Sequence, residues 1–276
     1  SRQGCPLSPL LFALIVEPLA ATIRQLPANK GIPIGSRVYK AVHYADDILA
    51  AVTDPGNSLL ALYSLLLTFE QASGFKINFD KSTILNLSLP HTVVLLLQGQ
   101  LPFKWADHSI TYLGVQLTPS ISDLFQRNYV PLLAAVRQDL ERWRSLFLSW
   151  IGRINIIKMS ILPKFLYLFQ GLPIWMDPAF LDGVQRCFFR FTWQGPRPRL
   201  SHKLLTQHQK LGGLSVPSVA HYYVMAQLGV VADWTTPDCG KLGCDLDHTI
   251  VCHPVWDLVW LPKALRPPNT YLSIPV

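Results

Sequence analysis

The amino-acid sequence predicts an α+β fold, with an antiparallel sheet and helices at residues 1–118 and a helical region at 119–232. Two observations carry this prediction. Short apolar runs bounded by turn-forming residues, a pattern typical of strands and hairpins, are concentrated before residue 118. From Asp123 onward, apolar residues recur instead at helical spacing. Residues 233–276 lose this period and contain several prolines, so we expect an irregular tail there.

The first expected element is a helix that starts at Ser8, as its cap, and ends near Gln25. Pro9 suits the first helical position, where a missing N–H costs nothing. Pro18 predicts a bend inside the helix. Its apolar residues cover a broad face and favour a core helix: Leu11, Phe12, Ile15, Val16 and Leu19.

The next pattern centres on Tyr44-Ala45-Asp46-Asp47, which lies between the apolar runs 38–43 and 48–52. This arrangement predicts a strand, a tight turn and a second strand, with both carboxylates at the tip. Paired carboxylates on a rigid hairpin suit Mg²⁺, a cation that prefers oxygen ligands. Asp is equally common in ordinary solvated turns, so the tetrapeptide alone leaves both interpretations open.

The mixed layer is expected to continue with a helix at 59–72 that ends before Gly74, and with a strand near 83–87. Residues 103–105 and 110–117 are expected to pair as a hairpin around Asp107-His108. Helices should follow at 129–143, 149–162 and 180–193, the last of them capped by Asp177-Pro178.

Composition limits the class of protein. Half of the 276 residues are hydrophobic, which is enough for a sizeable core. The uncharged stretches 82–103 and 211–232 contain Gly, Pro and polar residues, so neither is a membrane span. The five cysteines are odd in number and mostly far apart, which favours a reducing compartment, and we expect an intracellular, nuclear or cytoplasmic location.

The C-terminal cysteines raise the question of a zinc site. The candidate ligands are Cys239, Cys244, Cys252 and His253. Their spacing lacks the close cysteine pairs of such sites, which argues against zinc.

The positive charge is concentrated in one segment. Residues 137–210 hold twelve Lys or Arg against four acids, a net charge of +8, whereas residues 1–136 carry +1 and residues 211–276 carry −2. A polyanion is the natural partner of such a segment. The candidate nucleic-acid contacts are Arg142, Arg153, Lys158, Arg186 and Arg190. We expect most of the interleaved tryptophans, Trp143, Trp150, Trp175 and Trp193, to lie in the core rather than to stack on bases.

Several motifs in the same order resemble the reverse transcriptase of non-LTR (LINE-type) retrotransposons. The first is Arg2-Gln3-Gly4-Cys5-Pro6-Leu7-Ser8-Pro9-Leu10-Leu11-Phe12. It is followed by Tyr44-Ala45-Asp46-Asp47, by residues 73–78 with Lys81-Ser82, and by Tyr112-Leu113-Gly114-Val115. The resemblance extends to about residue 230, and it implies a polymerase palm followed by a helical thumb.

The resemblance also implies roles for particular residues. Asp46 and Asp47 would be the catalytic metal ligands for Mg²⁺, with Asp46 as the principal one, because successive strand side chains point to opposite faces. Lys81 would protonate the pyrophosphate leaving group, although an ordinary surface lysine beside Asp80 is an equal alternative. Substrate contacts would come from Arg2, Gln3, Gly4 and Tyr44, and the primer grip from Tyr112, Leu113 and Gly114. The implied partners are an RNA template, a DNA primer and dNTP.

One part of the expected site is missing from this sequence. Two-metal nucleotidyl transfer needs carboxylates around both ions. The family takes another aspartate from a strand upstream of the glycine loop, but here no Asp precedes Asp46, and the one earlier acid, Glu17, lies in the apolar helix. We therefore expect the C-terminal part of a palm plus its thumb, inactive by itself. A non-catalytic nucleic-acid-binding remnant and a product that does not fold stably are the alternatives.

Overall fold

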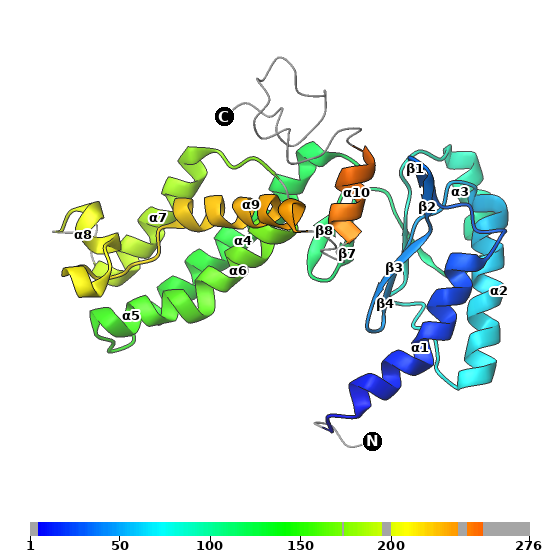
Figure 1. Cartoon of the computed structure of the whole chain (residues 1–276), viewed down its shortest axis with the longest axis horizontal. Coiled ribbons are helices and arrows are strands. Elements are labelled where there is room, and N and C mark those ends of the chain that lie inside the picture. Colours follow the sequence, from blue (N-terminus) through cyan, green and yellow to red (C-terminus); the bar gives the residue numbers. More distant parts are fainter. Residues whose placement is uncertain (1–4, 173, 195–199, 237–241, 251–276) are drawn as a thin grey trace, which may run out of the picture. The chain divides into compact units, whose positions relative to one another are not determined.

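The computed structural model describes residues 5–172, 174–194, 200–236 and 242–250. The chain divides into two compact units, Ser1–Ile121 and Ser122–Val276. The first unit combines helices with short paired strands, and the described part of the second is built from helices (Figure 1). The predicted α+β class is therefore confirmed. In the described residues, no helix has the length and apolar character needed to cross a membrane.

Two helices form the frame of the first unit. α1 (Ser8–Gln25) and α2 (Pro55–Ser73) contact each other, and α1 also packs on strand β3 (Figure 1). The core between them is centred on Leu19, Ile23 and Leu62. As predicted, α2 ends at a left-handed glycine, Gly74, with a φ of 75°.

The N-terminal half of α1 differs from its prediction. Buried side chains are confined to Val16 and the residues after it, whereas Leu11 and Ile15 are 45% and 44% exposed, so the predicted core face is wrong for those two. Ser8 is not the cap either. The cap position is Leu7, which offers no side-chain oxygen to the first free N–H groups.

The strands form four separate pairs. β1 (Ile32–Ile34) and β2 (Arg37–Tyr39) are antiparallel, as are β3 (Ala41–Tyr44) with β4 (Asp47–Ala50) and β7 (Ile110–Tyr112) with β8 (Val115–Leu117). β5 (Thr83–Leu85) and β6 (Lys104–Ala106) are parallel, which corrects the prediction of an antiparallel sheet throughout. Residues 38–43 do not form one strand, as was predicted. They are divided at Lys40 between β2 and β3, which belong to different hairpins.

The predicted hairpin between 103–105 and 110–117 is wrong as well. The first of these segments pairs with β5. The helix α3 (His91–Gln98), which was not predicted from the sequence, supplies the crossover that a parallel pair requires. The second segment folds on itself. Its turn residues Leu113 and Gly114 have φ of 48° and 78°, the backbone of a type I′ hairpin turn.

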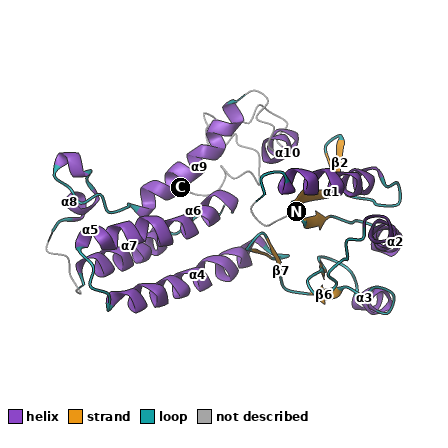
Figure 2. Ribbon diagram, turned by 90° about the horizontal axis from the view of Figure 1, so that it is seen from below, coloured by secondary structure: helices purple, strands orange, loops and turns teal. Residues whose placement is uncertain are grey.

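The second unit is a set of packed helices (Figure 2). α4 (Ile121–Arg144) is followed by α5 (Trp150–Ile156), which runs through a π-helical turn (Ile157–Ile161) into α6 (Leu162–Gly171). α7 (Pro178–Trp193) packs on α5 and on α9 (Val219–Thr235), and α9 also packs on α6. The predicted cap of α7 is confirmed, because Asp177 Oδ1 accepts a hydrogen bond from Ala179 N at 2.9 Å.

Two further helices are short. α8 (His202–Thr206) is capped by Ser201, and α10 (Leu242–Ile250) lies in the segment that was predicted to be irregular. Trp234 at the end of α9 donates its indole N–H to Asp247 Oδ2 of α10 at 2.9 Å. The helix at 242–250 therefore corrects that part of the prediction.

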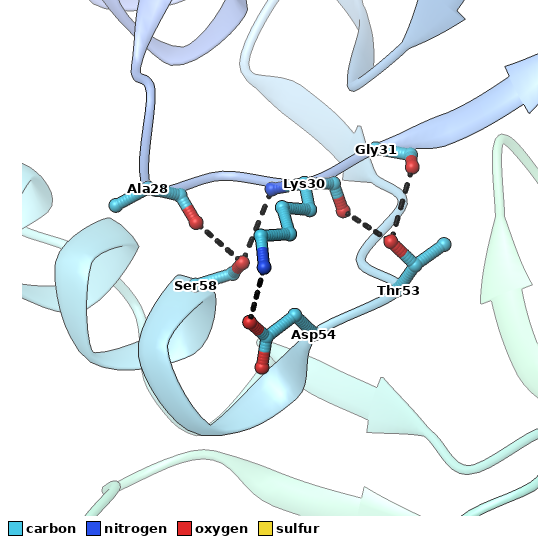
Figure 3. A network of polar contacts seen from close by, with 6 residues as sticks. All are labelled: Ala28, Lys30, Gly31, Thr53, Asp54 and Ser58. Atoms are coloured by element: carbon cyan, nitrogen blue, oxygen red, sulfur yellow. Dashed lines mark hydrogen bonds and ion pairs between the residues drawn. The ribbon is translucent and has the colours of Figure 1, made fainter.

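A small polar network joins the loop after α1 to the start of α2 (Figure 3). The Ser58 hydroxyl donates to Ala28 O at 2.6 Å and accepts from Lys30 N at 3.1 Å. Thr53, which follows β4, donates its hydroxyl to Lys30 O at 3.0 Å. Lys30 Nζ lies 3.1 Å from Asp54 Oδ2, and this hydrogen bond holds the pKa of Asp54 below its usual value. The network fixes the base of the β3–β4 hairpin.

We predict that Ser58→Ala lowers the free energy of unfolding of the first unit by about 1–3 kcal/mol, because Ser58 is fully buried and its loss leaves a carbonyl and an N–H unpaired. Urea unfolding measures the change. Ser64→Ala is the matched control on the same helix, since its exposed hydroxyl bonds only to Ala61 O. Equal stability of the two variants would contradict the role of the network.

Candidate active site

The two adjacent carboxylates lie at the tip of the β3–β4 hairpin. The strands pair with Ala41 opposite Ala50 and Tyr44 opposite Asp47, so the turn consists of Ala45 and Asp46 alone. Ala45 has a φ of 52°, a left-handed conformation that costs a residue with a Cβ roughly 1–2 kcal/mol. The prediction of a hairpin with both acids at its tip is confirmed.

The alternation of side chains decides what each face of the hairpin does. Directly paired residues share a face, so Ala41, Ala50, and Ile48 belong to one face, and these three pack on the core formed by α1 and α2. Tyr44 and Asp47 share the other face. The Tyr44 side chain is 67% exposed, and both carboxylates are exposed. One face therefore anchors the hairpin, and the tip is left to present polar groups.

Among the described residues, no hydrogen bond or ion pair holds either carboxylate of the pair. The charge of Asp47 acts on the phenol of Tyr112 in β7. Burial raises the pKa of Tyr112, and the negative charge of Asp47 raises it further. The Tyr112 hydroxyl is itself buried without a hydrogen-bond partner among the described atoms. Tyr112, on the hairpin predicted to be the primer grip, therefore lies within electrostatic range of Asp47.

Glu17, the other acid of this region, is engaged elsewhere. Its carboxylate forms an ion pair with Arg24 on the same helix and lies 3.8 Å from His43 Nε2 on β3. These contacts join α1 to the hairpin. Glu17 therefore has a structural role.

The donor set at the tip fits a hard divalent cation. Two exposed carboxylates provide oxygen ligands, and Mg²⁺ is commonly held by one or two carboxylates together with water and substrate phosphates. Across the described ranges there is no cluster of three or more His, Cys, Asp or Glu residues. The hairpin thus supplies one arm of a metal site. Of the candidate zinc ligands, Cys244 is buried in α10, and Cys239, Cys252 and His253 lie outside the described residues.

The remaining predicted residues of the first unit are not drawn into one cluster. Lys81 is exposed between α2 and β5, and its backbone N–H donates to Asn78. Leu113 and Gly114 form the turn between β7 and β8. Arg2, Gln3 and Gly4 lie outside the described residues.

Arg153 was predicted to contact nucleic acid, and the structure contradicts this. Its side chain is fully buried, and its guanidinium donates to three carbonyl oxygens: Leu146 at 3.1 Å, Leu148 at 3.3 Å and Phe191 at 3.2 Å. The guanidinium also lies 5.2 Å from the centre of the Phe191 ring. Burial lowers the pKa of Arg153 from its ordinary value. This residue ties the loop between α4 and α5 to the end of α7.

The other predicted cationic residues remain available at the surface. Arg186 and Arg190 are exposed on α7, Lys158 is half-buried in the π-helical turn, and Arg142 pairs with Asp139 at 2.9 Å. The expectation that most of the tryptophans lie in the core is wrong, because Trp143 and Trp193 are only half-buried and the other two are exposed. Trp150 is 50% exposed and Trp175 is 42% exposed.

The fold and the site together define a class of protein, an α+β domain that offers a pair of carboxylates to a divalent metal. The comparison with known families narrows this class of protein to one family of similar sequences. Residues 1–117 match the family described as reverse transcriptase (RNA-dependent DNA polymerase).

Similar proteins come from transposable elements. The chain is 28% identical over 199 residues to the transposon TX1 uncharacterized 149 kDa protein of Xenopus laevis, a match to 70% of this chain and 15% of that protein. It is 29% identical over 178 residues to the Pol polyprotein of the type-1 retrotransposable element R2 of Nasonia vitripennis, 60% of this chain and 16% of that protein.

A third relative, the Pol polyprotein of the type-2 element R2DM of Drosophila melanogaster, is 40% identical over 81 residues, 29% of this chain and 7% of that protein. The resemblance to retrotransposon reverse transcriptases is thus confirmed. The chain spans less than a fifth of the length of each of these relatives.

We predict that Asp47→Asn lowers the pKa of Tyr112 toward its ordinary value, because the negative charge that disfavours tyrosinate is removed. The titration is followed by carbon NMR of labelled tyrosines, with Tyr112→Phe to assign the signal. Asp46→Asn, one residue away in the turn, should leave this pKa unchanged. An equal shift in both variants would contradict the placement of Asp47.

We predict that Arg153→Lys lowers the free energy of unfolding of the second unit by about 1–3 kcal/mol for each carbonyl left unpaired, since one ammonium cannot reach all three. Arg186→Lys is the control, because Arg186 is exposed and bonds only to Asp182 O of its own helix. Chemical denaturation compares the two. Unchanged stability together with weaker nucleic-acid binding would restore the original interpretation of Arg153.

Proposed function

We propose that this chain contributes the metal-binding hairpin of an RNA-directed DNA polymerase, which copies an RNA template onto a DNA primer from dNTP substrates. The observation that carries the proposal is the Asp46-Asp47 pair at an anchored hairpin tip, within the residues that match the reverse transcriptase family. The names of the R2 relatives support a role in a retrotransposable element.

The chemistry assigned to the hairpin is that of a metal ligand. Mg²⁺ bound there would stabilise the charge that develops on the transferring phosphate. Asp46 in the turn is the principal ligand, and Asp47 on the face of Tyr44 is the second. Tyr112, whose phenol is influenced by the charge of Asp47, positions the primer, and Lys81 supplies a proton to the leaving pyrophosphate.

The two carboxylates do not complete a two-metal site. Nucleotidyl transfer by two ions needs further carboxylate ligands that hold both metals in line with the attacking and leaving oxygens. The described residues bring no third acidic, cysteine or histidine side chain to the pair. We propose that the additional ligand comes from outside residues 1–276.

A metal-binding experiment tests the role of the hairpin. Mn²⁺ in place of Mg²⁺ should broaden the NMR signals of residues around Asp46, and adding dATP should strengthen this effect because its phosphates supply further oxygen ligands. Asp46→Asn should abolish the effect. Asp107→Asn, an exposed aspartate of the same unit, is the control. Identical broadening in wild type and Asp46→Asn would refute the proposed site.

A primer-extension assay tests the missing ligand. Purified residues 1–276, given an RNA template, a DNA primer, dNTP and Mg²⁺, should show negligible extension, because two carboxylates hold one arm of the site only. The Asp46→Ala and Asp47→Ala double variant provides the background. Robust extension by the wild-type chain above this background would show that the 276 residues contain a complete site.

A further inference from the structure

A pair of stacked tryptophans marks a second surface of interest, in the helical unit. Trp150 opens α5 and Trp193 closes α7, and their rings lie 4.7 Å apart at an interplanar angle of 26°. Half of the Trp150 side chain is exposed, and the neighbouring Phe147 and Ile151 are exposed as well. Large apolar side chains that are exposed together are a feature of binding surfaces, so this cluster indicates a binding role.

A hollow adjoins the stacked pair. It is shallow and open to solvent, with a volume of about 410 Å³. The lining residues are Leu148, Ser149, Trp150, Ile151 and Gln194. The hollow therefore combines an aromatic wall with the amide of Gln194, which offers both a donor and an acceptor.

The buried Arg153 holds this surface in shape. Its guanidinium joins the carbonyls of Leu146 and Leu148, just before Trp150, to that of Phe191, two residues before Trp193. The hydrogen bonds therefore fix the two chain segments that carry the stacked rings. A site that is already ordered loses little conformational entropy when a ligand binds.

The charge around the stack favours an anionic ligand over an apolar one. Arg186, Arg190 and Trp193 follow one another at spacings of four and three, so they lie on one face of α7, and both arginines are exposed. The segment 137–210 carries a net charge of +8. Aromatic rings beside guanidinium groups are the combination that binds single-stranded nucleic acid, in which unpaired bases stack and phosphates meet positive charge.

We propose that the Trp150–Trp193 stack is a binding site for an unpaired base of a single-stranded nucleic acid. The base stacks on the exposed face of Trp150, its edge meets the Gln194 amide, and the flanking phosphates meet Arg190. A duplex would not fit, because its base faces are covered by neighbouring pairs. The inference rests on the proposed function for the nature of the partner, but it concerns a surface separate from the hairpin.

Fluorescence anisotropy with a labelled single-stranded oligonucleotide tests this site, with RNA in one arm and DNA in the other. The full chain is used in EDTA, so that metal binding at Asp46 plays no part. Trp150→Ala should weaken binding by about tenfold, as expected for the loss of one stacked base. Trp150→Phe should retain most of the affinity. Trp175→Ala removes another half-exposed tryptophan of the same unit and should change nothing.

Further variants and ligands separate base stacking from other causes of a loss of oligonucleotide affinity. With an abasic oligonucleotide, the wild type and Trp150→Ala should bind equally, and Gln194→Ala, which leaves the stack intact, should reduce binding to the base-containing strand only. The proposal is overturned if the wild type does not bind, if Trp150→Ala is harmless, or if it acts equally on the abasic strand. It is also overturned if Trp150→Ala abolishes self-association, measured by sedimentation, while oligonucleotide binding persists.

These outcomes are distinct from failure of the proposed function. Asp46→Asn should leave the oligonucleotide affinity in EDTA unchanged, and Trp150→Ala should leave Mn²⁺ broadening at the hairpin unchanged. Loss of the metal effect with retained Trp150-dependent binding would overturn the polymerase proposal alone. The converse result would overturn the stacking site alone.

Discussion

The burial of one face of the β3–β4 hairpin is the constraint on which the first unit depends. A two-stranded hairpin is only marginally stable by itself. Here Ala41, Ile48 and Ala50 pack on the core of α1 and α2, centred on Leu19, Ile23 and Leu62. Because side chains alternate along a strand, this burial assigns Tyr44 and Asp47 to the opposite face. The position of the carboxylates thus follows from apolar contacts that lie away from them.

In the second unit, the position of exposed groups also depends on a buried contact, and here the buried residue is charged. A buried guanidinium is costly unless its donors are paired, and Arg153 is paired with three backbone carbonyls. The chain segments that it joins carry Trp150 and Trp193. A residue that resembles a nucleic-acid contact in the sequence therefore acts from the interior, by shaping a surface that other residues present.

In both units, the proposed functional groups lie on elements that are packed against the protein on one side and exposed on the other. In the first unit, the network of Ser58, Thr53 and Lys30 closes the base of the hairpin (Figure 3). Among the described residues, no hydrogen bond or ion pair holds the side-chain carboxylates at its tip. In the second, the arginines of α7 remain exposed beside a stacked aromatic pair. Rigid support with exposed polar or aromatic groups is the arrangement that binding and catalysis require.

The sequence alone determined the class of fold, the hairpin tip with its two acids, the C-terminal end of α2, the start of α7, and the resemblance to reverse transcriptases. Each of these is predicted by a local sequence pattern: alternation in strands, a glycine after α2, an Asp-Pro pair before α7, and contiguous motifs. The tertiary structure decided what depends on distant partners. Examples are the pairing of β6 with β5 rather than with residues 110–117, and the effect of Asp47 on Tyr112. The exposure of Leu11 and Trp150 and the burial of Arg153 likewise depend on residues far apart in the chain. No local pattern encodes such contacts, because burial is settled by what the rest of the chain places against each residue.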